Sequence, residues 1–159
     1  MSNSTPTPLP KYIYKIHPSS PPPPEPLPVS LPLSALDARD NFMHLSTSSQ
    51  ILGTLQKFFS SATHVYILRI PYERVAKFIA WEDSQGKGPD ENGGSWDFDE
   101  KRGYFPHIYA NAGPGEGEQG LKLGKDEVES VGVWKRGDGT WSSETWPFGE
   151  DLPKQCDIE

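Results

Sequence analysis

The sequence predicts one small α+β domain with few helices. Its 159 residues suit one domain of ordinary size, and residues 48–60 carry the apolar spacing of an amphipathic helix. Several other segments are short and rich in β-branched and aromatic residues, which favours strands. Because no run of 18 apolar residues occurs, a membrane-spanning helix is excluded.

The chain begins with a polar, proline-rich region. Residues 1–10 are expected to be a disordered segment, and the alternating aromatic and β-branched residues of 11–16 predict the first strand. Eleven of the 17 prolines lie in residues 6–32, so we expect the loop 18–32 to be extended. Two interpretations of this loop stay open: a stiff segment that wraps the domain, or a ligand for a proline-reading adaptor domain.

The next elements lead into the most clearly predicted helix. Residues 30–37 favour a turn or a short helix, and 42–45 favour a short strand. Thr47 and Gln50 have the spacing of a capping box, in which Thr47 accepts from the Gln50 N–H and Gln50 reaches back to Thr47. The apolar face of the helix over 48–60 is then formed by Ile51, Leu52, Leu55, Phe58 and Phe59.

The second half alternates apolar segments with polar ones. The remaining strands are predicted at residues 64–70, 78–82, 103–109 and 128–134. An acidic insert, 83–103, interrupts this single domain of residues 11–134, and an acidic tail follows at 135–159. Trp141 and Trp146 of the tail could form a docking patch or fold back on the domain. We favour fold-back, because an exposed indole leaves a large apolar area in water.

Charge and cysteine content restrict the function classes. The net charge is −7 and no stripe of Lys and Arg is present, which disfavours general nucleic-acid binding and docking on an anionic membrane. A pocket for one nucleotide needs only one or two bases and stays open. The one cysteine, Cys156, allows no internal disulfide and suits a reducing compartment. Residues 1–10 lack the basic start and apolar core of a signal peptide, so we expect a cytoplasmic or nuclear protein.

The first group of residues that could carry chemistry surrounds His44. Strand alternation places Phe42, His44 and Ser46 on one face, directly before a helix start whose free N–H groups could hold an anion or an amide. Thr47 adds a hydroxyl. A plain structural interpretation, a cap beside a histidine bonded to backbone, stays open and is favoured by the residues alone.

Two further groups follow. Trp81-Glu82 places a carboxylate beside an indole at a strand end, where it could accept from a ribose hydroxyl or act as an acid or base. The alternative is a surface Glu beside a core Trp. His107 and Tyr109 share the face of another strand. No third ligand accompanies His44 and His107, so no metal is expected.

These groups resemble a known family. Residues 40–50 read Asp-Asn-Phe-Met-His-Leu-Ser-Thr-Ser-Ser-Gln; Trp81-Glu82 and then Phe-Pro-His-Ile-Tyr at 105–109 follow. This order is similar to the domain-of-unknown-function family numbered 952, and the proline-rich loop resembles its fungal members. The resemblance covers about residues 12–134. Asn41 and Ala110 stand where the family pattern has glycine; Asn41 is tolerable because asparagine also adopts positive φ.

The resemblance implies a compact split-sheet fold like that of the ADP-ribosyltransferases, with kinship to the RNA 2′-phosphotransferases. It implies a cleft of the nucleotide or NAD type and no assigned activity. The arginine set of the phosphotransferases is not matched, so their reaction is not transferred.

Two functional hypotheses result. In the first, a nucleotide or another small molecule, with NAD as the candidate cofactor, binds one concave site. Glu82 and His44 are the candidate catalytic residues, and Glu82 accepts from a ribose hydroxyl while Tyr109 stacks on an aromatic ring. The expected ligand-binding set is Tyr14, His44, Ser46, Thr47, Trp81, His107 and Tyr109. In the second, the protein is a non-catalytic binding or scaffold module that works through its proline-rich and acidic segments.

Overall fold

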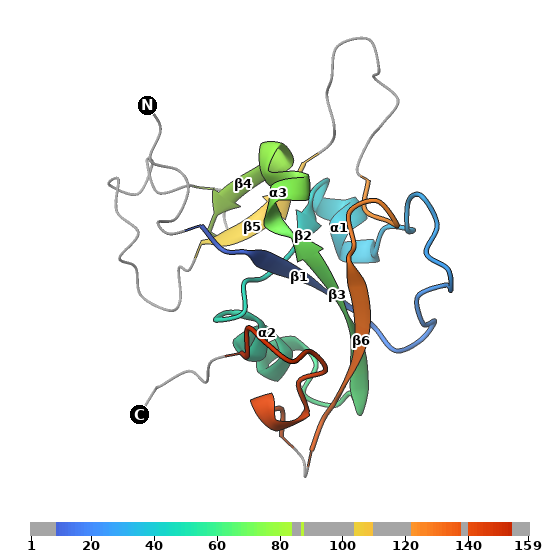
Figure 1. Cartoon of the computed structure of the whole chain (residues 1–159), viewed down its shortest axis with the longest axis vertical. Helices are drawn as coiled ribbons and strands as arrows, with labels where there is room; N and C mark the ends of the chain where they lie inside the picture. Colours follow the sequence, from blue (N-terminus) through green and yellow to red (C-terminus); the bar gives the residue numbers. More distant parts are fainter. Residues whose placement is uncertain (1–8, 84–86, 88–103, 110–121, 138–139, 154–159) are drawn as a thin grey trace.

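Two three-stranded antiparallel sheets form the centre of the molecule (Figure 1). The computed structural model describes residues 9–83, 87, 104–109, 122–137 and 140–153. The insert 83–103 and residues 1–10 lie almost entirely outside these ranges, so the expectations about them are not addressed. The predicted α+β class is confirmed by antiparallel sheets accompanied by short helices.

The first sheet has the strand order β1-β3-β6. Strand β1 (Tyr12–His17) pairs antiparallel with β3 (His64–Pro71), and β3 pairs antiparallel with β6 (Ser130–Lys135). Each matches a segment predicted from β-branched and aromatic content, within one or two residues at its ends.

The second sheet has the order β2-β5-β4, so its central strand comes last in the sequence. Strand β2 (Met43–His44) and strand β4 (Ile79–Glu82) pair antiparallel with opposite edges of β5 (Phe105–Ile108). A bridge between Tyr14 and Ser46 connects β1 to the chain just after β2. The second sheet therefore lies close to β1.

The helices are short. Within the described residues they are α1 (Ala35–Asp40), α2 (Ile51–Phe58), α3 (Tyr72–Val75) and the 3₁₀ turns Ala76–Phe78 and Ser143–Thr145. Ser34 caps α1 by accepting from the Asp37 N–H, and Asn41 ends it with φ of 64°. The left-handed conformation at Asn41 is the one asparagine tolerates better than most residues.

The predicted start of the main helix was partly wrong, since α2 begins at Ile51 and not at residue 48. Gln50 does reach back, since its Oε1 accepts from the Thr47 N–H at 3.0 Å. The Thr47 hydroxyl contacts Ser49 Oγ, and the Gln50 N–H bonds to the Thr47 carbonyl, so residues 47–50 form a turn before α2. The apolar face is as predicted at Ile51, Leu52 and Leu55, which are buried, whereas Phe58 is 69% exposed at the helix end.

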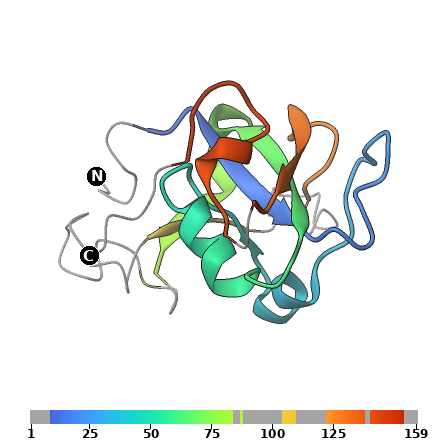
Figure 2. The same cartoon turned by 90° about the horizontal axis from the view of Figure 1, so that it is seen from below.

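The two faces of the β1-β3-β6 sheet belong to two apolar clusters. Alternation sends Ile13, Leu68 and Ile70 to a cluster shared with the inner face of the second sheet, including Met43 and Trp81. The opposite face packs under α2 and the C-terminal segment, which Figure 2 shows side by side. The layers are therefore the second sheet, the first sheet, and a cover of α2 with residues 140–153.

The C-terminal tryptophans fold back on the domain, as the sequence predicts. Trp141 and Trp146 are 2% and 8% exposed, and the Trp146 ring lies edge-on to Trp134 and Tyr14 at centroid distances of 4.8 and 5.1 Å. Gly132 permits this approach, because a Cβ there would lie 2.6 Å from the Pro147 side chain. The tail thus supplies part of the core.

The proline-rich loop runs along the domain and is tied down at its end. The Leu31 N–H bonds to the Leu123 carbonyl, and the Lys125 N–H bonds to the Pro28 carbonyl. Pro23 and Leu31 are buried, whereas most of the loop is exposed. Binding of a proline-reading adaptor domain stays a prediction.

Candidate functional site

The outer face of the β2-β5-β4 sheet gathers four of the predicted site residues. Register places His44 beside His107 on one edge of β5 and Ala80 beside His107 on the other. Because side chains alternate along a strand, His44, His107 and Glu82 share the face that points away from the core. Tyr109 follows β5 on the same face. Residues from three distant stretches therefore meet here.

Glu82 is the centre of this group. Its Oε1 accepts from His107 Nδ1 at 2.9 Å and from the Tyr109 hydroxyl at 2.7 Å. The Glu82 side chain is 15% exposed, and its Oε2 has no hydrogen-bond partner among the described residues. Two donors on the same oxygen thus fix the orientation of the carboxylate.

Both donors, His107 and Tyr109, keep the proton that they donate to Glu82 at neutral pH. Burial lowers the pKa of His107, although the hydrogen bond to Glu82 raises it in part, so the ring is neutral at pH 7. Its proton lies on Nδ1, because that nitrogen faces the carboxylate. Burial and the hydrogen bond to Glu82 both raise the pKa of Tyr109 above its ordinary value. The phenol therefore stays protonated and keeps donating to Glu82.

Phe42 packs the imidazoles and the phenol into one aromatic cluster. Its ring stacks on His107 with centroids 4.3 Å apart, and it lies 4.6 Å from His44 and 5.2 Å from Tyr109. The two imidazoles meet edge to face at 5.4 Å. These contacts fix the orientations of the rings relative to one another.

His44 is held by two aspartates of α1. Its Nδ1 lies 2.7 Å from Asp37 Oδ1, and its Nε2 lies 3.0 Å from Asp40 Oδ2. Only a doubly protonated ring can donate to both carboxylates. Asp40 is also bonded to Arg39 at 2.8 Å. Both ring nitrogens of His44 thus face carboxylates, which fix the orientation of the ring.

Asp37 connects His44 to a lysine beneath it. Lys15 Nζ donates to Asp37 Oδ2 at 2.5 Å and to the His44 carbonyl at 3.1 Å. Burial alone would raise the pKa of Asp37, but the donors on His44 and Lys15 together lower it, so the carboxylate is ionised at neutral pH. Burial lowers the pKa of Lys15, and Asp37 opposes that shift. Lys15 and Asp37 therefore form an ion pair, and the removal of the lysine ammonium from water costs free energy.

The other predicted site residues lie elsewhere. Trp81 is 3% exposed in the core and donates to the Tyr72 hydroxyl at 3.3 Å. Tyr14 is buried on the far face of the first sheet, where its hydroxyl donates to Asp151 at 2.6 Å. Ser46 is buried at the bridge to Tyr14, and Thr47 belongs to the turn before α2. Alternation does not carry from His44 to Ser46 because β2 ends at His44.

Phe42 was expected beside His44 but was not among the expected ligand-binding residues, and Asp37, Asp40 and Lys15 were not expected at the site. Phe42 had a usable signal, since it shares the predicted strand face with His44. Lys15 lies on the same strand face as Ile13, which the structure buries. The aspartates had none, because their contact with His44 depends on how α1 docks on β2.

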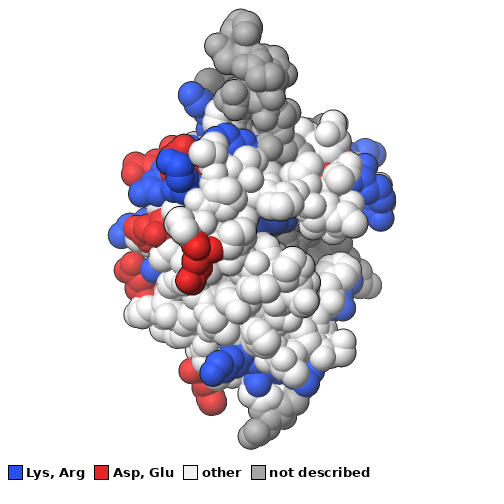
Figure 3. Space-filling view, turned by 90° about the vertical axis from the view of Figure 1, so that its right-hand side faces the viewer, with Lys and Arg blue, Asp and Glu red and all other residues white. Residues whose placement is uncertain are grey.

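Charge and metal-binding geometry add further observations. On the face shown in Figure 3, acidic and basic residues are interspersed around a broad uncharged area. Among the described residues, no group of three or more His, Cys, Asp or Glu side chains has the arrangement of a metal site. No helix in the described ranges has the length and apolarity to cross a membrane.

Comparison with known proteins decides the family. The family model named "Protein of unknown function (DUF952)" matches residues 29–131. The chain belongs to the DUF952 family. The match contains α1 and all three strands of the second sheet, and therefore the whole Glu82 and His44 arrangement apart from Lys15.

Solved structures and curated proteins complete the comparison for this DUF952 chain. The fold is similar to that of the crystal structure of protein CC0527 from Caulobacter crescentus, with a TM-score of 0.50 and 22% identity over 82% of this chain and 93% of that one. A double mutant of CC0527 gives the same values. This likeness concerns the fold alone. No curated protein matched the sequence.

Proposed function

We propose that the outer face of the β2-β5-β4 sheet binds a ribose-bearing small molecule of the nucleotide or NAD type. One observation supports this most: Glu82 is oriented by two donors on Oε1 beside an aromatic cluster, and its Oε2 has no hydrogen-bond partner among the described residues. A carboxylate fixed in this way is a strong acceptor for a sugar hydroxyl.

The aromatic cluster supplies the second half of the proposed recognition. The Phe42 and Tyr109 rings lie 5.2 Å apart next to Glu82, where a nicotinamide or a nucleobase can pack while the ribose reaches the carboxylate. His44 lies at the edge of the cluster with its ring fixed by Asp37 and Asp40. We propose the ADP-ribosyltransferase-like fold on the same basis, the family resemblance together with split antiparallel sheets.

The same geometry suggests a chemical role. A carboxylate near the ribose stabilises the positive charge that develops at the ribose carbon when its bond to nicotinamide breaks. The electron pair of that bond leaves with nicotinamide, and water attacks the ribose carbon to give ADP-ribose. Glu82 is therefore the proposed catalytic group, and His44 is a positioning residue whose ring nitrogens are already bonded. Release of nicotinamide from NAD by the wild type, and none by Glu82→Gln, would support this role; equal release from both would contradict it.

Binding is tested by titration calorimetry with NAD and ADP-ribose. Glu82→Gln preserves shape, removes the charge, and is expected to weaken binding about tenfold, the value of one charge-assisted hydrogen bond. Glu73→Gln is the matched control, since Glu73 is exposed on α3 away from the site. No heat from either ligand at millimolar concentration, with the fold intact, would refute the proposal.

A further inference from the structure

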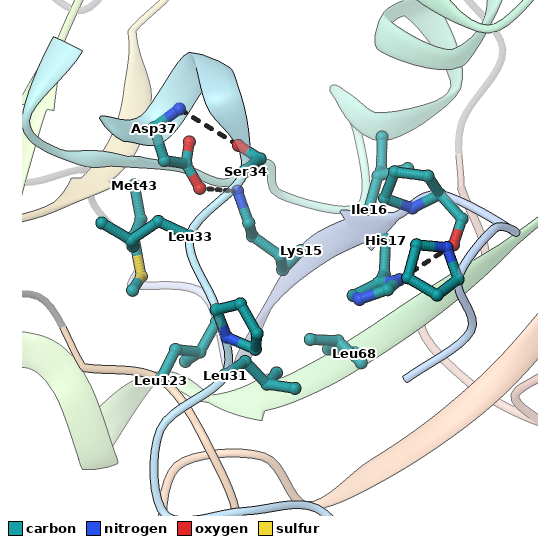
Figure 4. A pocket seen from close by; sticks show the side chains of 13 residues that line it. Lys15, Ile16, His17, Leu31, Leu33, Ser34, Asp37, Met43, Leu68 and Leu123 are labelled. Atoms are coloured by element: carbon teal, nitrogen blue, oxygen red, sulfur yellow. Dashed lines mark hydrogen bonds and ion pairs between the residues drawn. The ribbon is translucent and has the colours of Figure 1, made fainter. Parts of the chain in front are cut away.

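A separate hollow of about 190 Å³ lies between β1, α1 and the proline-rich loop (Figure 4). It is on the opposite side of β2 from Glu82, because Met43 lines it while the neighbouring side chains of Phe42 and His44 point to the other face. The walls are mainly apolar and are formed largely by Ile16, Leu31, Leu33, Met43, Leu68 and Leu123.

One end of this hollow is polar. Lys15 and Asp37 both line it, and Figure 4 shows their side chains meeting there. The Lys15 ammonium has three protons and donates to two acceptors, Asp37 Oδ2 and the His44 carbonyl. One further proton of a lysine side chain that is 15% exposed is thus available at the pocket end.

The charges of Lys15 and Asp37 determine which kind of hydrogen-bond acceptor a ligand can place at this end of the pocket. Lys15 and Asp37 already neutralise each other, so a carboxylate on the ligand would lie close to the Asp37 carboxylate and be repelled. A neutral carbonyl or amide oxygen avoids this repulsion and still accepts from the ammonium.

The volume of the pocket limits the size of the ligand. An apolar cavity of about 150 Å³ accommodates benzene. This pocket is somewhat larger, which leaves space for a six-membered ring that carries one small polar group.

We propose that the pocket binds a small uncharged ring compound with one carbonyl or amide oxygen, its ring on the leucines and its oxygen at Lys15. This site is distinct from the proposed nucleotide-type site, since the two lie on opposite faces of β2. Asp37 lies between them and bonds to Lys15 on one side and His44 on the other.

The test follows methyl NMR signals of the lining leucines during titration with three probes, benzamide, benzoate and benzene. Benzamide is expected to shift the Leu31 and Leu123 methyls, with a Kd about tenfold below that of benzene, and benzoate is expected to bind more weakly than benzamide. Absence of these shifts with millimolar benzamide would overturn the proposal. Equal Kd values for the three probes would also overturn it, because Lys15 would then contribute nothing.

Two tryptophan variants provide a matched control. Leu33 lines the pocket and is 40% exposed, so Leu33→Trp should fill the entrance without disturbing the core. Leu36 is 44% exposed nearby and is not part of the lining, so Leu36→Trp should bind benzamide normally. Equal binding by the two variants would contradict the assigned location. Glu82→Gln should leave benzamide binding unchanged, which separates this test from the nucleotide proposal.

Lys15→Met tests the polar end. Benzamide and benzene are expected to bind this variant with similar Kd values, because the donor is gone while the apolar walls remain. A retained preference for benzamide would refute the role of Lys15. Should this variant fail to fold, the two tryptophan variants still decide the location.

Discussion

Replacement of Asp37 by asparagine is expected to destabilise the fold more than any surface substitution. The Asp37 side chain is 2% exposed and accepts from Lys15 Nζ, His44 Nδ1 and the His44 N–H. Asparagine has about the same shape but offers one carbonyl oxygen and no charge. The buried ammonium of Lys15 then loses its counter-charge.

The expected cost is about 3 kcal/mol in the free energy of unfolding, the lower end of the range of about 3–5 kcal/mol for removing one partner of a buried ion pair. The lower end applies because Lys15 is 15% exposed and keeps its bond to the His44 carbonyl. For a chain of this length, the cost corresponds to a fall in Tm of roughly 6–12 °C.

Urea denaturation followed by tryptophan fluorescence measures the change. Asp126→Asn is the control, because the Asp126 side chain is 60% exposed and its ion pairs lie at the surface. The double variant Lys15→Met/Asp37→Asn should lose less than the sum of the two single losses, since no charge is then left unpaired. A loss below about 1 kcal/mol for Asp37→Asn would refute the inferred ion pair.

The pKa of Asp37 gives the same prediction a pH dependence. Its folded-state pKa lies below the ordinary value of about 3.9. The stability it contributes is therefore present above about pH 4 and lost as the pH falls through the lower folded value. The stability difference between wild type and Asp37→Asn should shrink over that acidic range. A difference that stays constant would contradict the assignment.

Three further predictions concern other parts of the molecule. Asn41→Ala should cost about 1 kcal/mol, because φ is 64° there, whereas Asn41→Gly should cost less; equal losses in urea denaturation would count against backbone strain. Trp146→Ala should cost about 3–5 kcal/mol, and a smaller loss than 1 kcal/mol would show that the tail is not part of the core. In an NMR pH titration the His107 ring should titrate with a midpoint below about 6.5, because its pKa is lowered in the folded protein. The stability that the neutral ring contributes should therefore fall as the pH drops below about 6.5. A midpoint above about 6.5 would contradict the burial of this ring.

Elements marked by local pattern were predictable from the sequence. β1 and β3 have dense β-branched and aromatic content, and α2 has a clear apolar face with Ile51, Leu52 and Leu55. The fold-back of the tail was predictable because Trp141 and Trp146 have too much apolar area to leave in water. In each case the signal lies within the segment itself.

Contacts set by docking were not predictable. The Gln50 amide donates to the Tyr104 carbonyl, which is 54 residues away in the sequence and is indicated by no local motif. The same holds for Asp37, whose partners come from β1 and β2. The meeting of Glu82, His107 and Tyr109 was anticipated through the family resemblance, whereas strand register explains it physically.

The proposed site on the outer face of the β2-β5-β4 sheet is tested most directly by asking whether one ligand changes the signals of both His44 and His107. Histidine side-chain NMR during titration with ADP-ribose is expected to show the His44 and His107 ring signals shifting together, with one Kd, while His64 on β3 stays unchanged. Binding that leaves both rings unshifted, or that shifts His64 instead, would contradict the proposed site.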